Sequence, residues 1–208
     1  MESLDDLTRA ISVCRICVEA PRGAPLPHEP RPVAWPSATA RILVAGQAPG
    51  TRVHASGRPF TDPSGDRLRD WMGVDEATFY DRGRIAIVPM GFCFPGHDAK
   101  GGDLPPRREC RLAWHDRLMA AMPQVDLVLA IGAKAQAYHL ERLGLGALHR
   151  RSLTETVVGW RGIVDASDAP LVFALPHPSW RNSGWLKRHA WFALELLPTL
   201  RQAVAARL

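Results

Sequence analysis

The four cysteines of the chain are spaced as metal ligands often are. Cys14 and Cys17 form a C-x2-C pair, and Cys93 and Cys110 follow much later in the chain. A thioredoxin-like redox pair would open a helix that follows a strand, whereas this pair precedes every strand-like segment. A disulfide framework is unexpected in a cytoplasmic chain of this size. The thiols therefore predict either tetrahedral zinc or an iron–sulfur cluster, and spacing alone does not separate the two.

A glycine-rich turn is the second candidate for chemistry. The segment GQAPGTRVHASGRPFTD runs from Gly46 to Asp62, directly after the apolar run RILVA. It has neither the GK[ST] of a P-loop nor the G-x-G-x-x-G of a dinucleotide-binding turn. Gly46 keeps the turn open, and Pro49 restricts Ala48 to extended backbone. The turn is a candidate ligand-binding loop in which Phe60 and a carboxylate follow the second glycine group.

A histidine in HPSW is the third candidate. His177 follows the last strand-like run and stands between Pro176 and Pro178. A histidine at the end of a strand is more often structural than catalytic. The two prolines nevertheless fix the backbone there, which suits an imidazole that must be held in one pose.

These residues need a sheet to bring them together. The helix-like stretches are 64–72, 107–122, 133–143 and 184–208, and the short apolar runs are RILVA (41–45), RIAIVPM (84–90), DLVLAIG (126–132) and PLVFALP (170–176). This alternation predicts an α/β fold, a three-layer α/β/α sandwich with a central four-stranded parallel sheet. Ligands bind beyond the carboxyl ends of such strands. The turn after 41–45, the loop at 91–102 and HPSW should therefore meet at one rim.

We expect a single domain over 1–208. Residues 4–17 should form a short helix, and residues 18–39 hold six prolines. We therefore expect 1–39 to be an irregular segment that the four cysteines tie to the loop after the second strand. The acidic, amphipathic N-terminus is not a signal peptide, and no run of apolar residues is long enough to span a membrane. We expect a cytoplasmic monomer.

The charge balance leaves two interpretations open. Lys and Arg number 26 against 21 Asp and Glu, which gives a formal net charge of +5. Such an excess fits an ordinary solvated surface and a polyanionic partner equally well.

Taken together, GQAPG…GRPFTDPSG, the four cysteines and the terminal HPS resemble the uracil-DNA glycosylase superfamily. The motifs occur in the same order over about residues 14–200. The resemblance is closest to the iron–sulfur branches, the fourth and fifth families, and it favours a four-iron, four-sulfur cluster over zinc. It implies a base excision repair hydrolase that flips uracil out of DNA and cuts the N-glycosidic bond, leaving an abasic site. No lyase step is expected, because a helix-start position explains Lys134, the one lysine near the rim.

The resemblance also implies roles for the rim residues. His177 would donate to the base O2 as the anion forms, with the backbone amides of Gln47 and Ala48 beside the same oxygen and Gly46 holding the turn open. Phe60 would stack on the flipped base; without the motif it would be interpreted as a core residue. Asp62 would position water and stabilise the sugar cation, or else it only caps the helix from Ser64. Asp66 is the fallback carboxylate.

The chain departs from the family pattern at the residue that reads the base. The usual Asn, four residues before the third cysteine, is Pro89 here, which has neither a side-chain amide nor a backbone N–H. Backbone groups of Met90 or Gly91, another side chain, or water would then have to read the base. We therefore expect a relaxed base range that includes xanthine or hypoxanthine.

The segment after HPS supplies candidates for contacts with DNA. Arg181 is the candidate wedge or phosphate contact, and Asn182 is near enough to orient His177 or to join the base contacts. Lys187 and Arg188 would meet phosphates, or else they form a solvated helix face. Trp180 could equally pack on the last helix.

Two other functions remain open at this stage. The same fold could be a non-catalytic or covalent-capture binding protein for uracil-containing DNA. One iron–sulfur relative captures the abasic sugar through a histidine in an extra basic loop; that insertion is absent here, although His54 lies in the glycine-rich segment. An unrelated nucleotide hydrolase fits the fold but lacks a metal-binding carboxylate cluster.

Overall fold

A computed structural model of the chain describes residues 2–208, and its centre is an all-parallel sheet of four strands in the order β2-β1-β3-β4. The strands are β1 (Ile42–Ala45), β2 (Ile85–Ile87), β3 (Leu127–Ile131) and β4 (Leu171–Leu175). In register, Val44 of β1 lies between Ile87 of β2 and Leu129 of β3. All but Leu171 of these strand residues are buried, as expected when helices cover both faces of a sheet. Each of the four predicted strands is confirmed.

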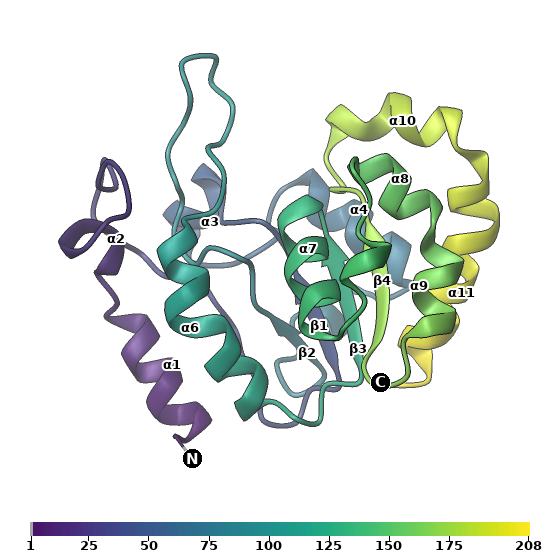
Figure 1. Cartoon of the computed structure of the whole chain (residues 1–208), viewed down its shortest axis with the longest axis horizontal. Helices are drawn as coiled ribbons and strands as arrows, with labels where there is room; N and C mark the ends of the chain where they lie inside the picture. The colour runs from purple at the N-terminus through teal and green to yellow at the C-terminus, as the bar shows by residue number, and fades with distance from the viewer. Residues whose placement is uncertain (1) are drawn as a thin grey trace.

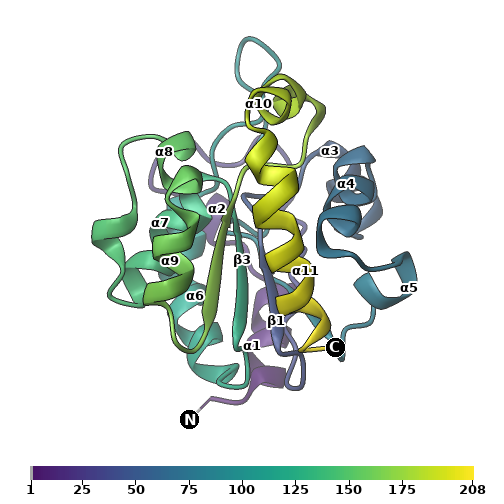
Figure 2. The same ribbon diagram turned by 90° about the vertical axis from the view of Figure 1, so that its right-hand side faces the viewer.

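Helices cover the two faces of the sheet and complete three layers (Figures 1 and 2). Because side chains alternate along a strand, Leu43 and Ala45 face one apolar cluster while Ile42 and Val44 face the other. The first cluster takes in α1 (Leu4–Ser12), α6 (Arg108–Ala121) and α7 (Ala133–Arg142), and the second takes in α4 (Pro63–Met72) and α11 (Leu197–Ala205). The predicted α/β/α sandwich is confirmed.

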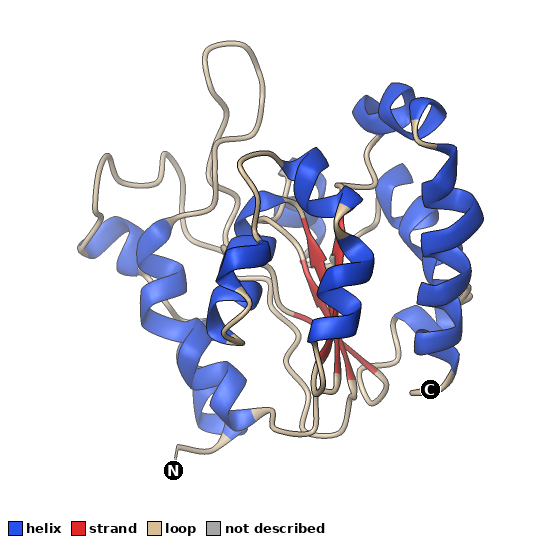
Figure 3. Ribbon diagram, turned by 45° about the vertical axis from the view of Figure 1, so that its right-hand side comes forward, coloured by secondary structure: helices blue, strands red, loops and turns tan. Residues whose placement is uncertain are grey.

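Shorter helices fill the connections between these elements, as Figure 3 shows in blue. The sequence predicted none of them, except that α2 overlaps the end of the helix expected over 4–17 and α10 overlaps the start of the one expected over 184–208. They are short and are set by local caps; α8, for instance, begins with a capping box between Ser152 and Glu155. They are α2 (Ile16–Glu19), α3 (Thr51–Ser56), α5 (Glu76–Phe79), α8 (Leu153–Val158), α9 (Trp160–Ala166), α10 (Ser183–Arg188) and the 3-10 turns η1 (Gly146–Leu148) and η2 (Trp180–Asn182).

The two terminal helices differ from the expectation. The stretch 184–208 is not one helix: α10 ends at Arg188, and a π-helix, η3 (Phe192–Leu196), leads into α11. Pro198 lies in the first turn of α11 and has no N–H to donate to the preceding turn, which explains the wider winding before it. At the other end, α1 stops at Ser12 and α2 follows as a separate turn, so 4–17 is not continuous either.

The irregular stretch after α2 lies along the outer strand of the sheet. Trp35 and Ile87 exchange two backbone hydrogen bonds of 2.7 and 2.9 Å, and the N–H of Val33 donates to the carbonyl of Phe92 at 2.7 Å. These bonds occupy part of the open edge of β2, which would otherwise expose unpaired backbone groups. Among residues 2–208, no helix is both long and apolar enough to cross a membrane.

Candidate active site

A cavity at the carboxyl ends of the strands brings the predicted rim residues together. Its inner part, of about 110 Å³, is lined by Phe60, Pro89, Asp62 and His177 together with the glycine-rich turn from Gly46 to Gly50. An outer groove of about 560 Å³ shares Asp62, His177 and residues 47–49 with it and extends to Trp180 and Arg181. Phe60 and His177 therefore lie on one cavity, although 117 positions separate them in the sequence.

Phe60 is held in an uncommon backbone conformation. Its φ is 55°, in the left-handed region that non-glycine residues rarely adopt. The hydroxyl of Tyr80 donates to the carbonyls of both Pro59 and Phe60 at 2.9 Å, and the ring of Phe79 meets the ring of Phe60 edge-on at 5.9 Å. Strained residues persist where their surroundings over-determine them, and they concentrate at ligand sites.

The glycine-rich turn presents two free backbone donors. Within the described chain, the N–H groups of Gln47 and Ala48 donate to no protein acceptor. The side chain of Gln47 instead turns toward the sheet, where its Nε2 donates to the carbonyl of Ile131 at 3.0 Å. Gly132, at a φ of 84°, leaves room for that side chain, because a Cβ there would overlap it. The turn is thus anchored by its glutamine and keeps its amides for a ligand.

His177 is positioned through its backbone. The Asn182 Nδ2 donates to the carbonyl of His177 at 2.7 Å, so Asn182 fixes the loop that carries the imidazole. Burial lowers the pKa of His177 below its ordinary value, and the charges of Asp62 and Asp103 oppose that shift. Since burial is the larger cause, the ring is neutral at pH 7 and has one N–H to donate.

Three carboxylates near the turn differ in their placement. Asp62 caps α4 by accepting from the N–H of Ser64 at 3.0 Å, so the structural role expected for it is present, and its side chain also lines both parts of the cavity. Asp66 is exposed, pairs with Arg69 at 2.5 Å and lines neither part, so the structure does not bring the fallback carboxylate to the cavity. Asp103 lines both parts and was missed.

Asp103 comes from the long loop between β2 and α6, the teal hairpin that projects from the molecule in Figure 1. Its carboxylate lies 3.2 Å from His97 Nδ1, and His97 Nε2 lies 3.2 Å from the hydroxyl of Thr51. This chain of contacts joins the hairpin to the start of α3. The sequence signal for Asp103 is that it directly follows the 91–102 loop, which the sequence already places at the rim.

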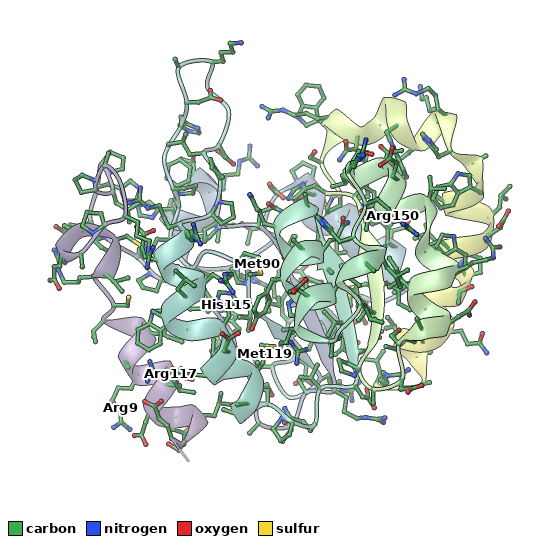
Figure 4. All side chains as sticks on the ribbon, viewed as in Figure 1. Arg9, Met90, His115, Arg117, Met119 and Arg150 are labelled. Carbon is green, nitrogen blue, oxygen red and sulfur yellow. The ribbon has the colours of Figure 1, made fainter. Side chains whose placement is uncertain are left out.

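Met90 and Gly91, whose backbone groups are among the candidates for reading the base, both have their N–H groups in use. Met90 N–H donates to the carbonyl of Gly46 at 2.9 Å, and Gly91 N–H donates to the carbonyl of Gln47 at 2.8 Å. Both donors are therefore used to hold the glycine-rich turn against the end of β2. The Met90 side chain lies between α6 and α7 (Figure 4) and lines a different cavity.

Comparison with known families agrees with this geometry. The family model described as the uracil DNA glycosylase superfamily matches residues 34–201, which include the glycine-rich turn and HPS. The chain belongs to the uracil DNA glycosylase superfamily. A candidate uracil DNA glycosylase from Methanosarcina acetivorans, solved by solution NMR, is similar at a TM-score of 0.47 and 16% identity, covering 81% of this chain and 94% of that chain. The family assignment rests on the family model and not on that match.

The segment after HPS is exposed at its start. Trp180 is 76% exposed, so it does not pack on the last helix, and the Arg181 guanidinium lies 6.0 Å from the centre of its indole ring. Both residues line the outer groove. Lys187 and Arg188 lie in the exposed last turn of α10 and line neither part of the cavity.

The four cysteines converge where the N-terminal segment meets α6. All four are free thiols, and Cys17, Cys93 and Cys110 are buried. Two N–H groups point at sulfur, because Trp114 Nε1 donates to Cys14 Sγ and the backbone of Phe92 donates to Cys110 Sγ, both at 3.3 Å.

Burial raises the pKa of Cys17 to about 11 and that of Cys93 to about 12, and repulsion between neighbouring thiolates adds to both shifts. Within residues 2–208, no three His, Cys, Asp or Glu side chains are close enough to hold one metal ion. The donor set, four soft thiols with N–H groups aimed at two of them, is nevertheless chemically suited to a larger cluster. The family match begins at residue 34, so Cys14 and Cys17 lie outside it.

His54 lies apart from the candidate active site. Its ring packs 4.4 Å from His28 and 6.0 Å from Phe94, and it lines neither part of the cavity.

Proposed function

We propose that the chain is a monofunctional DNA glycosylase that removes uracil from DNA. The observation that carries the proposal is the convergence of Phe60, His177 and Asp62 on one cavity at the carboxyl ends of the strands. An apolar ring face, a neutral imidazole and a carboxylate are what hydrolysis of an N-glycosidic bond requires, and the family to which the chain belongs acts on DNA.

The chemistry follows from where charge develops. The bond between the base nitrogen and C1′ of the deoxyribose breaks, and its electron pair stays on the base. The N–H of His177 and the free amides of Gln47 and Ala48 would stabilise that anion, each contributing about 3–4 kcal/mol by analogy with oxyanion sites. Asp62 would stabilise the sugar cation and take the proton of the water that adds to C1′. Asp103 adds a second negative charge beside it.

The base range should be relaxed. Pro89 lines the inner cavity where the family pattern has an amide side chain, and the neighbouring backbone N–H groups are already used. A pocket with few fixed donors and acceptors at one base edge discriminates weakly among bases that differ there. Xanthine and hypoxanthine are therefore proposed as further substrates.

A four-iron, four-sulfur cluster, or zinc as the alternative, would be held by Cys14, Cys17, Cys93 and Cys110. When bound, it would brace the structure and supply no reacting group, because the thiols do not line the catalytic cavity. It would tie residues 1–39 to the remainder of a single domain over 1–208, which we propose acts as a monomer.

On the DNA itself, Trp180 and Arg181 would fill the space that the base vacates. Trp180 is large, apolar and exposed, as a side chain that replaces a base in the stack must be. Lys187 and Arg188 would contact phosphates at the edge of the same surface.

A base-release panel tests the proposal. Oligonucleotides with a single uracil, xanthine, hypoxanthine or thymine are incubated with the protein and heated in alkali, with His177→Ala as the comparison. We expect strand scission at the first three bases and a loss of about a hundredfold or more in the variant.

The same experiment separates the alternatives. Intact DNA for every base would mean a binding protein, and a protein–DNA band that survives denaturation would mean covalent capture. Cleavage at uracil alone would contradict the relaxed base range and leave the glycosylase proposal in place.

A further inference from the structure

A second cavity lies beside the candidate active site, between helices α6 and α7. Its volume is about 510 Å³, and its apolar floor includes Met90, Ala137 and Tyr138. Figure 4 shows Met90 between these two helices. Pro106 lines this cavity and the outer groove of the active site alike, so the two hollows meet at that residue. We call this second cavity the α6/α7 groove.

The rim of the α6/α7 groove carries positive charge that the protein does not neutralise. Within residues 2–208, its cations Arg108, Arg111, Lys134 and Arg142 form no ion pair. A fifth cation, Arg107, is the exception, since it pairs with Glu109 at 2.8 Å.

Two carboxylates also line the groove, but neither pairs with these cations. Asp116 accepts a hydrogen bond of 2.7 Å from the hydroxyl of Tyr138, and Glu141 forms no ion pair in the described chain. Elsewhere many arginines pair with a carboxylate; Arg161 pairs with Glu195 and Arg201 with Asp70. A groove with several unpaired cations calls for an anionic occupant.

We propose that the α6/α7 groove binds the phosphate backbone of the DNA strand that flanks the flipped nucleotide. This inference rests on the proposed function. Two observations favour DNA over a free nucleotide or an acidic protein: the groove meets the active-site groove at Pro106, and Lys134 directly follows Ala133, which lines that active-site groove. A strand leaving the base pocket would thus pass from one hollow to the next, with its phosphates on the arginines and its sugars over the apolar floor.

The test measures binding, so that it does not depend on catalysis. Fluorescence anisotropy measures the affinity of each protein for a duplex without any target base, at several salt concentrations. The proteins compared are the wild type, the groove variant Arg108→Gln/Arg142→Gln and the matched control Arg161→Gln/Arg201→Gln. The control removes the same charge from arginines outside both grooves. We expect the groove variant to lose about tenfold or more in affinity, and its slope of log K against log salt to become shallower by about 2, for two lost phosphate contacts.

Duplexes truncated on one side of the uracil give the second readout. Truncation on the side that reaches the groove should abolish the difference between the groove variant and the control. Excision from a very short single strand should be equal in all three proteins, which shows that the variant is folded and its base pocket intact.

Equal duplex binding by groove variant and control would overturn the inference and leave the glycosylase proposal standing. A difference that persists on both truncated duplexes would also overturn it. If the wild type releases no base from any substrate, the proposed function fails. The anisotropy comparison still shows whether the α6/α7 groove binds DNA.

Discussion

At the scale of single residues, His177 is subject to opposing electrostatic influences. Burial lowers its pKa below the ordinary value of 6.5, while Asp62 and Asp103 partly reverse the shift. The ring is therefore neutral above that lowered pKa and becomes protonated as the pH falls through it. If the neutral ring is the form that acts, activity should decline on the acid side, at a pH below 6.5.

Replacing Asp62 with Asn separates its electrostatic role from its capping role. Asn caps a helix about as well as Asp, so the free energy of unfolding should change by less than about 0.5 kcal/mol. Loss of the charge should slow base release about a hundredfold, because the sugar cation loses its nearest counter-charge. It also removes an influence that raises the pKa of His177, so the acid limb of the pH–rate profile should move to lower pH.

Single-turnover rates across pH, together with urea unfolding, measure both effects. Asp103→Asn is the matched comparison in the same cavity, and we expect a smaller shift of the acid limb there, since the influence of Asp103 on His177 is the weaker one. An Asp62→Asn protein with wild-type rate and profile would show that Asp62 is only a helix cap.

At the scale of elements, the loop before α4 and the helix itself are fitted to each other. Gly65 lies in the first turns of α4, buried against the carbonyl of Phe60. A Cβ at Gly65 would overlap that carbonyl oxygen, and the backbone cannot move without shifting the aromatic ring. The conformation of Phe60 therefore depends on a glycine in the neighbouring helix.

We expect Gly65→Ala to lower the free energy of unfolding by about 2 kcal/mol and to slow base release, because the clash is with backbone in a packed site. Gly162→Ala is the matched control, because Gly162 is also helical, in α9. Among residues 2–208, no atom outside that helix lies within 4 Å of the position that a methyl group would take. This substitution should raise stability by about 0.5–1 kcal/mol, as alanine does in an exposed helix. Urea unfolding gives both values, and equal effects of the two substitutions would contradict the predicted clash.

The sequence specified these elements unequally. Each strand was predictable because it is a short aliphatic run, and parallel topology then placed HPS and the glycine-rich turn at one rim. Asp103 was not predictable, because its position depends on a hairpin held by His97 and Thr51. The backbone N–H groups of Met90 and Gly91 are used in hydrogen bonds to the glycine-rich turn. Such pairing between two loops cannot be predicted from the hydrophobic periodicity of the sequence. The π-helix before Pro198 had a sequence signal, the proline itself, but the apolar stripe of 184–208 pointed to one regular helix.

At the scale of the whole molecule, three kinds of contact hold the N-terminal segment. Helix α1 packs on α6, Trp35 bridges to Ile87, and the four cysteines meet near α6. The first two do not involve the thiols. The thiols by themselves repel one another when they are ionised. A bound cluster would remove this repulsion and would bond the N-terminal segment to α6 and to the loop after β2.

The purified protein should therefore absorb visible light from an iron–sulfur cluster, and Cys17→Ser should abolish that absorption. Since Cys17 is buried beside Leu26 and Cys93, its loss should also speed proteolysis within residues 14–39. The control Val13→Ser changes an exposed neighbour and should keep both the colour and the resistance. Colourless protein with bound zinc would assign the site to zinc. Metal-free wild-type protein that resists proteolysis as strongly as the metal-loaded protein would show that backbone and apolar contacts alone hold the segment.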